Sequence, residues 1–228
     1  MRHQVLFGLF VALTILLFLA FIFSSRANFR KKANRGLDFL CDFPFEAMGG
    51  QGPLTAISRT FLALFEAATV ASSLYLVYLF PSFDYMMGVV IIYGAASLLK
   101  AGAALTMSFV PAYYFKQHLI AFMLFNVLYA LAEAMSAICF LNLRGFSSEL
   151  SLTFMVISFA LVVVAVILAM NPRLSNWTKL KSTMEQDGSI VNERPRPFVL
   201  AATEWALFAC DFVGCLVSIL GFFLIASA

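Results

Sequence analysis

Six long apolar runs constrain the fold of this chain more than any other feature of its sequence. Each run has about 20 residues or more, the length that a helix needs to cross the hydrocarbon core of a bilayer. A helix satisfies its own backbone hydrogen bonds in lipid, and the alternating polar and apolar pattern of a membrane β-barrel is absent from the sequence. We therefore predict an all-α integral membrane protein with a single transmembrane domain over residues 1–228, whose six helices span about residues 4–23, 57–80, 87–110, 118–141, 150–170 and 198–226.

The composition agrees with a membrane protein and excludes several other classes. Hydrophobic residues make up 62% of the chain and charged residues 12%, whereas a soluble domain carries about 25% charged residues. This balance excludes a soluble globular domain, a disordered chain and a nucleic-acid-binding protein. The four cysteines form no C-x-x-C pair, and the two histidines, His3 and His118, are far apart in the sequence. We therefore expect neither a metal site nor a cofactor.

Basic residues are concentrated on one side of the predicted membrane. Twelve of the 15 Lys and Arg residues lie in or beside three segments on that side, and only Arg2 and Arg144 lie on the opposite side. Lys and Arg collect in the cytoplasmic loops of membrane proteins. The two long loops, residues 24–56 and 171–197, are therefore predicted to be cytoplasmic, which places both termini on the non-cytoplasmic side.

This orientation leads to a prediction for Asn176. Asn176-Trp177-Thr178 matches the acceptor triplet for N-glycosylation. Because the predicted orientation places this triplet in the cytoplasm, we expect Asn176 to remain unmodified when the protein is expressed in a eukaryotic membrane system. A mass shift at Asn176 that an endoglycosidase removes would reverse the predicted orientation.

Both long loops contain an amphipathic pattern with helical spacing. The apolar positions are Phe29, Ala33, Leu37 and Leu40 in the first loop and Leu174, Trp177, Leu180 and Met184 in the second. Helices of this kind lie in the headgroup plane of a membrane, with cationic residues near the lipid phosphates. We therefore predict one interfacial amphipathic helix in each cytoplasmic loop, with lipid-headgroup contacts from Arg30, Lys31, Lys32, Arg35, Lys179 and Lys181.

Five ionisable residues lie inside the predicted spans, where a charge is costly and marks a candidate functional position. They are Glu66, Lys100, Glu133, Glu204 and Asp211. Counted along the helices, Glu66, Lys100 and Asp211 fall near the bilayer midplane, whereas Glu204 falls near the cytoplasmic surface, within reach of water. Because an unpaired buried ammonium group is expensive, we expect Lys100 to pair with Glu66 or Asp211.

Small and polar residues share helix faces with these charges. Asn126 lies on the same face as Glu133, and Ser97 and Ala101 belong to a stripe of small residues beside Lys100. Small residues let helix backbones approach closely. The second, third, fourth and sixth spans are therefore predicted to surround a polar axis. The first and fifth spans contain no ionisable residue and are predicted to lie outside that axis, against lipid or a partner.

The charges inside the spans favour a transport function. We expect a small transporter or channel that moves a proton, a cation or a small cationic solute along the acidic axis, with a path formed by Glu66, Lys100, Glu133, Asp211, Asn126 and Glu204. A second interpretation is a non-catalytic structural or accessory subunit of a larger membrane complex, in which the same charges join helices or dock a partner. The expected partners are the lipid bilayer and either further copies of this chain or other membrane subunits, and no nucleic acid.

A lipid-modifying enzyme is the third interpretation. Asp38, Asp42 and Glu46 lie at the predicted cytoplasmic surface, where magnesium-dependent enzymes that act on lipid phosphates place carboxylates. These acids follow no fixed pattern, and the sequence contains no G-x-S-x-G elbow and no H-E-x-x-H motif. The sequence therefore favours a role that is not enzymatic.

Overall fold

The computed structural model describes residues 2–48, 52–79, 84–110, 115–143, 147–174, 181–184, 190–193 and 196–227. Over these residues the elements follow in the order α1 (Arg2–Ala33), α2 (Pro44–Met48), α3 (Pro53–Leu79), α4 (Asp84–Phe109), α5 (Phe115–Asn142), α6 (Ser148–Ala169), β1 (Lys181–Met184), β2 (Ile190–Glu193) and α7 (Val199–Ser227). Six of these helices are long and apolar enough to cross a membrane, with candidate spans at Gly8–Ala33, Pro53–Leu74, Met87–Phe109, Lys116–Asn142, Ser148–Ala169 and Val199–Ile225. The predicted set of six spanning helices is therefore confirmed in number, order and apolar character.

Helix α1 extends well beyond its predicted end and continues to Ala33. It ends where Asn34 adopts a positive φ of 52°, a left-handed conformation that asparagine tolerates better than most residues. The predicted interfacial helix of the first loop is therefore wrong. Phe29 and Ala33 belong to α1, whereas Leu37 and Leu40 follow after its end and are not helical.

The second loop contains strands where a helix was predicted. β1 and β2 pair in antiparallel fashion, with Lys181 opposite Glu193 and Met184 opposite Ile190. Lys181 and Met184 therefore have an extended backbone. The predicted interfacial helix is wrong over its C-terminal residues, Lys181 to Met184. Residues 175–180, which include Asn176, Trp177 and Lys179, lie outside the described residues.

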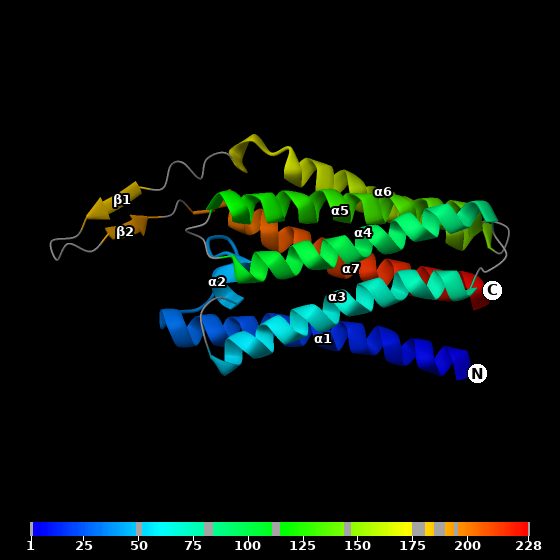
Figure 1. Ribbon diagram of the computed structural model, residues 1–228, viewed down its shortest axis with the longest axis horizontal. Coiled ribbons are helices and arrows are strands. Elements are labelled where there is room, and N and C mark those ends of the chain that lie inside the picture. The colour runs from blue at the N-terminus through cyan, green and yellow to red at the C-terminus, as the bar shows by residue number, and fades with distance from the viewer. Residues whose placement is uncertain are drawn as a thin grey trace.

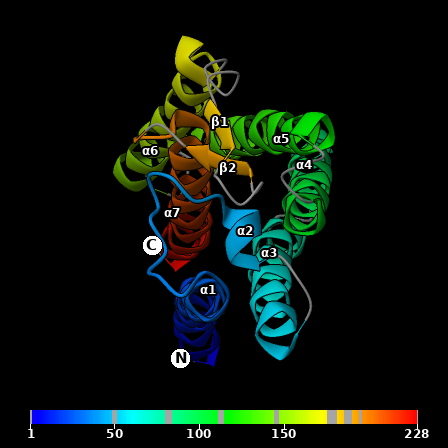
Figure 2. The ribbon, with the colours of Figure 1, turned by 90° about the vertical axis from the view of Figure 1, so that its left-hand side faces the viewer.

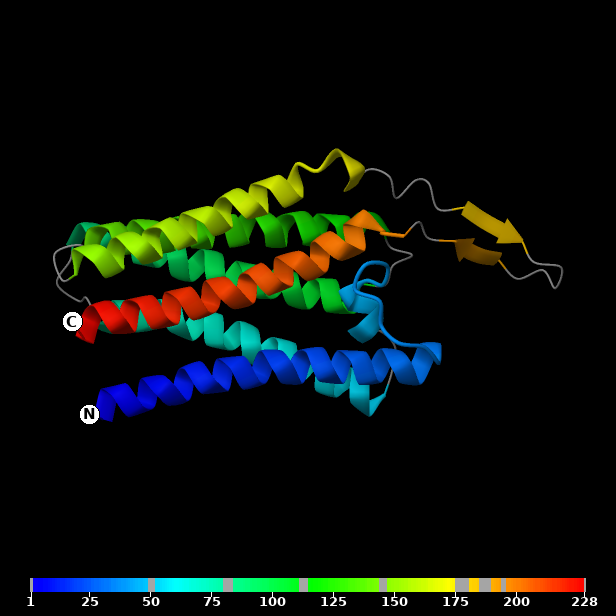
Figure 3. The same ribbon diagram turned by 180° about the vertical axis from the view of Figure 1, so that it is seen from behind.

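The long helices run side by side, and the two ends of the bundle differ. Figure 1 shows both termini at one end, which we call the terminal end, and α2 with the β1–β2 pair at the other, which we call the loop end. The view from behind shows α7 and α1 running along the same side of the bundle (Figure 3). Figure 2 looks onto the loop end and shows α2 lying between α7 and α3, both of which it contacts.

Helices α1 and α6 lie at the periphery of the bundle. In their most apolar stretches 17% of the residues of α1 and 11% of those of α6 are buried, compared with 50% for both α5 and α7. This agrees with the prediction that the first and fifth spans lie outside the polar axis. The large exposed apolar area of α1 and α6 is the surface that a lipid or a partner helix would cover.

The inward side of α1 packs through aromatic rings. Phe18 stacks on Phe212 of α7 with ring centroids 4.2 Å apart, and it also contacts Phe65 of α3 at 5.4 Å. Phe21 is fully buried, with its ring 6.3 Å from that of Trp205. Within a membrane, lipid tails are as apolar as these side chains, so close van der Waals packing rather than exclusion of water holds such helices together. The stacked rings therefore fix α1 against α3 and α7.

Residues 35–48, which we call the cover segment, close the loop end of the bundle. The segment includes α2, whose Phe45 is 5% exposed. The side-chain amide of Asn28 in α1 donates a hydrogen bond of 2.6 Å to the carbonyl oxygen of Ala47. Because Asn28 is itself buried, this bond ties α2 to α1 from inside the bundle.

Asp42 holds the cover segment together through charge and fastens it to α7 through its backbone. Its carboxylate is 1% exposed and accepts two hydrogen bonds from the Arg35 guanidinium, at 2.7 and 2.6 Å, and one from the backbone N–H of Asp38. This paired arrangement is the strong geometry for an arginine and a carboxylate, and the hydrogen bonds that Arg35 donates to Asp42 raise the pKa of Arg35. The indole N–H of Trp205 donates to the Asp42 carbonyl oxygen at 2.8 Å, so the segment is also fastened to α7.

Candidate functional site

Three charged side chains from three different helices meet inside the bundle. The Lys100 ammonium group on α4 donates a hydrogen bond to the Asp211 carboxylate on α7, and it lies 3.4 Å from Oε2 of Glu66 on α3. All three residues are almost completely buried, at 3%, 2% and 1% exposure. We call these three residues the Lys100 cluster. The predicted pairing of Lys100 with Glu66 or Asp211 is confirmed, and Lys100 contacts both acids.

The Lys100 cluster lies close to the middle of the helices that form it. Glu66, Lys100 and Asp211 fall near the centres of the candidate spans Pro53–Leu74, Met87–Phe109 and Val199–Ile225. Their burial therefore places them far from either end of the bundle, where water would solvate a charge. At this depth the two carboxylates are what compensates the ammonium group for its lost hydration.

Small residues on α4 allow this meeting of helices. Ser97, Ala101 and Ala104 are buried at 3%, 7% and 0% exposure on the same helix as Lys100. Without large side chains at these positions the backbone of α4 can lie close to its neighbours. The ammonium group of Lys100 can then reach acids on both α3 and α7.

Glu133 on α5 approaches the backbone of α7 beside the Lys100 cluster. Its carboxyl group lies against Gly214, where an added Cβ atom would collide with Glu133 Oε1. Gly214 follows Asp211 by three residues on α7, about 4.5 Å along the helix axis. Glycine at position 214 therefore leaves the space that Glu133, at 5% exposure, occupies.

A second buried pair lies between the Lys100 cluster and the cover segment. His118 Nε2 and Glu204 Oε1 are 2.9 Å apart, at 1% and 0% exposure. The rings of Phe45 and Phe43 in the cover segment lie over His118, with centroid distances of 4.4 and 5.8 Å. The expectation that Glu204 lies within reach of water is therefore wrong, because the cover segment and α5 enclose it.

Sequence analysis did not identify His118 as a site residue. The signal that could have found it is its depth, because His118 and Glu204 both stand just inside the loop end of their candidate spans, Lys116–Asn142 and Val199–Ile225. Two titratable groups at matching depth on two helices of one bundle are candidates for a pair.

Polar groups form a line along one face of α7. Glu204, Asp211, Gly214 and Ser218 recur at spacings of three, four or seven residues, which share one side of a helix. Ser218 makes a hydrogen bond of 3.1 Å with Ser136 of α5. The line therefore passes from the His118–Glu204 pair through the Lys100 cluster and Glu133 to the two serines.

Several polar atoms along this line have no hydrogen-bond partner among the described residues. They are both carboxylate oxygens of Glu66, one oxygen each of Glu133, Glu204 and Asp211, and Nδ1 of His118. A buried acceptor without a hydrogen bond carries the cost of its lost hydration, although the Lys100 ammonium group offsets part of this cost for Glu66 Oε2. These atoms are therefore available to accept a proton or to contact a cation or water.

The other predicted path residue, Asn126, makes a different contact. Its side-chain amide donates to the carbonyl oxygen of Ala165 on α6 at 3.3 Å, and it is 2% exposed. This bond joins α5 to α6 across a buried interface. The structure thus gives Asn126 a contact between helices and not a position in the Lys100 cluster.

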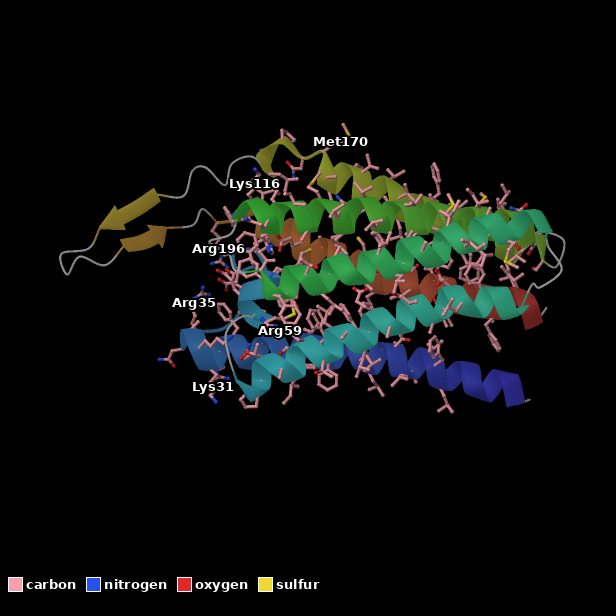
Figure 4. All side chains as sticks on the ribbon, in the orientation of Figure 1. Lys31, Arg35, Arg59, Lys116, Met170 and Arg196 are labelled. Atoms are coloured by element: carbon pink, nitrogen blue, oxygen red, sulfur yellow. The ribbon has the colours of Figure 1, made fainter. Side chains whose placement is uncertain are left out.

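The predicted headgroup residues divide into several groups. Arg30, Lys31 and Lys32 are exposed near the end of α1, whereas Arg35 is held by Asp42. Lys181 lies in β1, and Lys179 lies outside the described residues. Figure 4 shows the labelled side chains of Lys31, Arg35, Arg59, Lys116 and Arg196 at the loop end of the bundle, opposite the termini.

The three acids considered for an enzyme are engaged within the cover segment. Asp42 binds Arg35, Asp38 lies 3.3 Å from Arg196, and Glu46 accepts the backbone N–H of Phe43 at 2.9 Å. Over the residues that the structure describes, no group of three or more His, Cys, Asp or Glu side chains is arranged to hold a metal ion. These acids thus have contacts that stabilise the loop end.

Comparison with protein-family models, with curated proteins and with solved structures finds no match to this chain. A functional proposal therefore depends on the geometry of the buried charges alone.

Proposed function

We propose that this protein moves a proton or a small cation across a membrane along the polar line of α7. The observation that carries this proposal is the position of Lys100, buried near mid-span between carboxylates from two other helices. Buried ionisable groups at such depth are expensive and are typical of ion and proton pathways in membrane proteins. The unpartnered oxygens of four acids along the same line supply further acceptors.

The spacing along α7 suits transfer in stages. Glu204 and Asp211 are two helical turns apart, about 10 Å along the axis, and Gly214 with its neighbour Glu133 follows about 4.5 Å further. The step of about 10 Å from Glu204 to Asp211 is too long for direct transfer between these two carboxylates. Water or small side-chain movements must bridge it, and the buried unpartnered oxygens would bind such water.

The Lys100 cluster suggests how one step is coupled to ion binding. A proton that binds to the Asp211 carboxylate neutralises it and weakens its attraction for the Lys100 ammonium group. Glu66 Oε2, only 3.4 Å from the Lys100 nitrogen, then becomes the better partner. When Asp211 releases its proton toward the opposite side of the membrane, Lys100 pairs with Asp211 again. Lys100 therefore alternates between two acids while its charge remains paired.

The described conformation is closed at the loop end. Phe43 and Phe45 of the cover segment lie over His118, and the Asp42 carbonyl oxygen fastens the segment to Trp205 of α7. In the proposed cycle the His118–Glu204 pair exchanges its proton or cation with the loop-end solution only after this segment moves. The basic residues at the loop end favour the cytoplasm as the compartment on that side.

The proposal predicts that Asp211→Asn will abolish most of the flux. The full chain is reconstituted in liposomes, a potassium diffusion potential is imposed with valinomycin, and entry of protons is followed with an internal pH-sensitive dye. Asparagine keeps the shape of the aspartate side chain, but its amide cannot bind and release a proton as a carboxylate does. We expect flux to fall on the order of 100-fold, the lower range for loss of a positioned proton-transfer group.

Glu149→Gln is the matched control, because Glu149 is an exposed acid in the first turn of α6 and should leave the flux unchanged. Repeating the assay with sodium and potassium gradients distinguishes a proton from a cation. Full flux in Asp211→Asn at every pH, from protein that is folded and inserted, would contradict the role assigned to Asp211.

The second candidate function is an accessory subunit of a membrane complex, and the exposed faces of α1 and α6 favour it. In that case the Lys100 cluster would act only to join α3, α4 and α7. The native mass of the protein after gentle extraction from its own membrane separates the two functions. A species that contains only this chain supports the transporter, whereas a stable assembly with other polypeptides supports the subunit.

A further inference from the structure

The outward face of α1 carries a cationic hollow near the loop end. The hollow has a volume of about 790 Å³ and is lined by Arg26, Ala27, Arg30, Lys31, Asn34, Arg35, Gly36 and Leu37. Arg35 is already paired with Asp42. Arg26, Arg30 and Lys31 have no ion pair with any residue that the structure describes. Three positive charges at this hollow are thus left without a counter-charge from the described protein.

An apolar stripe on the same helix leads into this hollow. Leu9, Leu13, Leu16, Leu19 and Phe23 are exposed by 43% to 64%, although they are large and apolar. They are spaced three or four residues apart, which places them on one side of α1. Ala27, Arg30, Lys31 and Asn34 of the hollow continue this spacing, so the stripe and the hollow form one continuous surface.

The dimensions of this surface match one lipid molecule. From Leu9 to Phe23 the stripe extends about 21 Å at 1.5 Å per residue, which is long enough to cover one leaflet, half of a hydrocarbon core of about 30 Å. A lipid whose acyl chain lies against the stripe would therefore have its headgroup at the level of Arg26 and Arg30. Arginine binds phosphate oxygens with two parallel hydrogen bonds, and a cationic side chain at this level attracts anionic lipids.

We propose that this face of α1 binds one anionic phospholipid, with its phosphate at Arg26, Arg30 and Lys31 and an acyl chain along the leucine stripe. A free phosphate ion would need only the hollow, whereas the continuous apolar stripe selects a ligand with a chain. Figure 4 shows Lys31 and Arg35 at the loop end of α1, so the lipid belongs to the leaflet at that end. This site is separate from the Lys100 cluster and does not depend on transport.

The test measures lipid binding by the full chain purified in a mild detergent. Phosphatidylglycerol or phosphatidylcholine is titrated in, and native mass spectrometry counts the lipid molecules retained. We expect one tightly held phosphatidylglycerol and no comparable phosphatidylcholine. The double variant Arg30→Gln/Lys31→Gln should bind phosphatidylglycerol about 30-fold more weakly, on the order of fivefold for each cation removed. Both residues are exposed, so the variant should fold normally.

A matched control removes the same charge elsewhere. Lys116 and Arg173 are exposed cations that do not line the hollow, and Lys116→Gln/Arg173→Gln should retain wild-type affinity. An equal loss in this control, or equal retention of phosphatidylcholine, would overturn the proposal. Displacement of the lipid by millimolar inorganic phosphate would also overturn it, since the site would then bind a free anion. Leu16→Ala/Phe23→Ala should weaken phosphatidylglycerol binding, and unchanged binding in that variant would refute the contact with the acyl chain.

Discussion

Replacing Lys100 by methionine should destabilise the protein by about 3–5 kcal/mol, the usual cost of removing one partner from a buried ion pair. Methionine has a similar length and no charge, so it leaves the Asp211 and Glu66 carboxylates buried without their cation. The loss is measured as the change in unfolding midpoint when the detergent-purified protein is titrated with a denaturing detergent. A lower yield of monodisperse protein should accompany it.

The double variant Lys100→Met/Asp211→Asn provides the internal check on this prediction. It removes the Asp211 carboxylate, which hydrogen-bonds to Lys100, together with the cation. We therefore expect it to recover more than half of the lost stability. Lys116→Met, at an exposed position near the start of α5, is the control for removing a lysine and should behave as wild type. An unchanged midpoint in Lys100→Met, or no recovery in the double variant, would show that the pair does not hold these helices together.

The second large effect is expected at the His118–Glu204 pair. His118→Leu fills a similar volume but leaves the fully buried Glu204 carboxyl group without its only hydrogen-bond partner among the described residues. An unsatisfied buried polar group costs about 1–3 kcal/mol, and more when it is charged. We expect a loss of that size, together with easier cleavage of residues 35–48 by protease, because Phe43 and Phe45 pack on the His118 ring.

His118→Gln distinguishes the hydrogen bond from the packing. Its side-chain amide can still donate to Glu204, so it should retain most of the stability. If His118→Gln is as unstable as His118→Leu, the aromatic contacts with the cover segment and not the bond to Glu204 account for the loss. If His118→Leu is fully stable, the pair contributes nothing to the closed loop end.

The sequence was a good guide to the spanning helices and a poor guide to the loops. Each span is a local property, because about 20 apolar residues must leave water together wherever the helix packs. The helical spacing of Phe29, Ala33, Leu37 and Leu40 was also local, but Asn34 interrupted it with a left-handed turn. The strands at Lys181–Met184 and Ile190–Glu193 depend on pairing with each other, which no periodicity within one segment predicts.

The part of the candidate site that was predictable from the sequence is the part that follows from the free-energy cost of burying a charge. The expense of a buried ammonium group was enough to predict a partner for Lys100, and its small-residue stripe indicated a close helix contact. The His118–Glu204 pair and the fit of Glu133 against Gly214 required knowledge of which helix faces meet. A histidine near the start of a span is indistinguishable by sequence from one in contact with water.

The sequence by itself determined the six spans, the concentration of basic residues at one end and the set of charges placed inside the apolar segments. These follow from transfer free energies that each segment carries independently of its neighbours. Only the tertiary structure decided that Lys100 meets both Glu66 and Asp211, that Glu204 is sealed from water, and that residues 35–48 close the loop end. Pairing and burial depend on contacts between residues more than 30 positions apart, such as the 86 that separate His118 from Glu204, and such contacts exist only once the helices have packed.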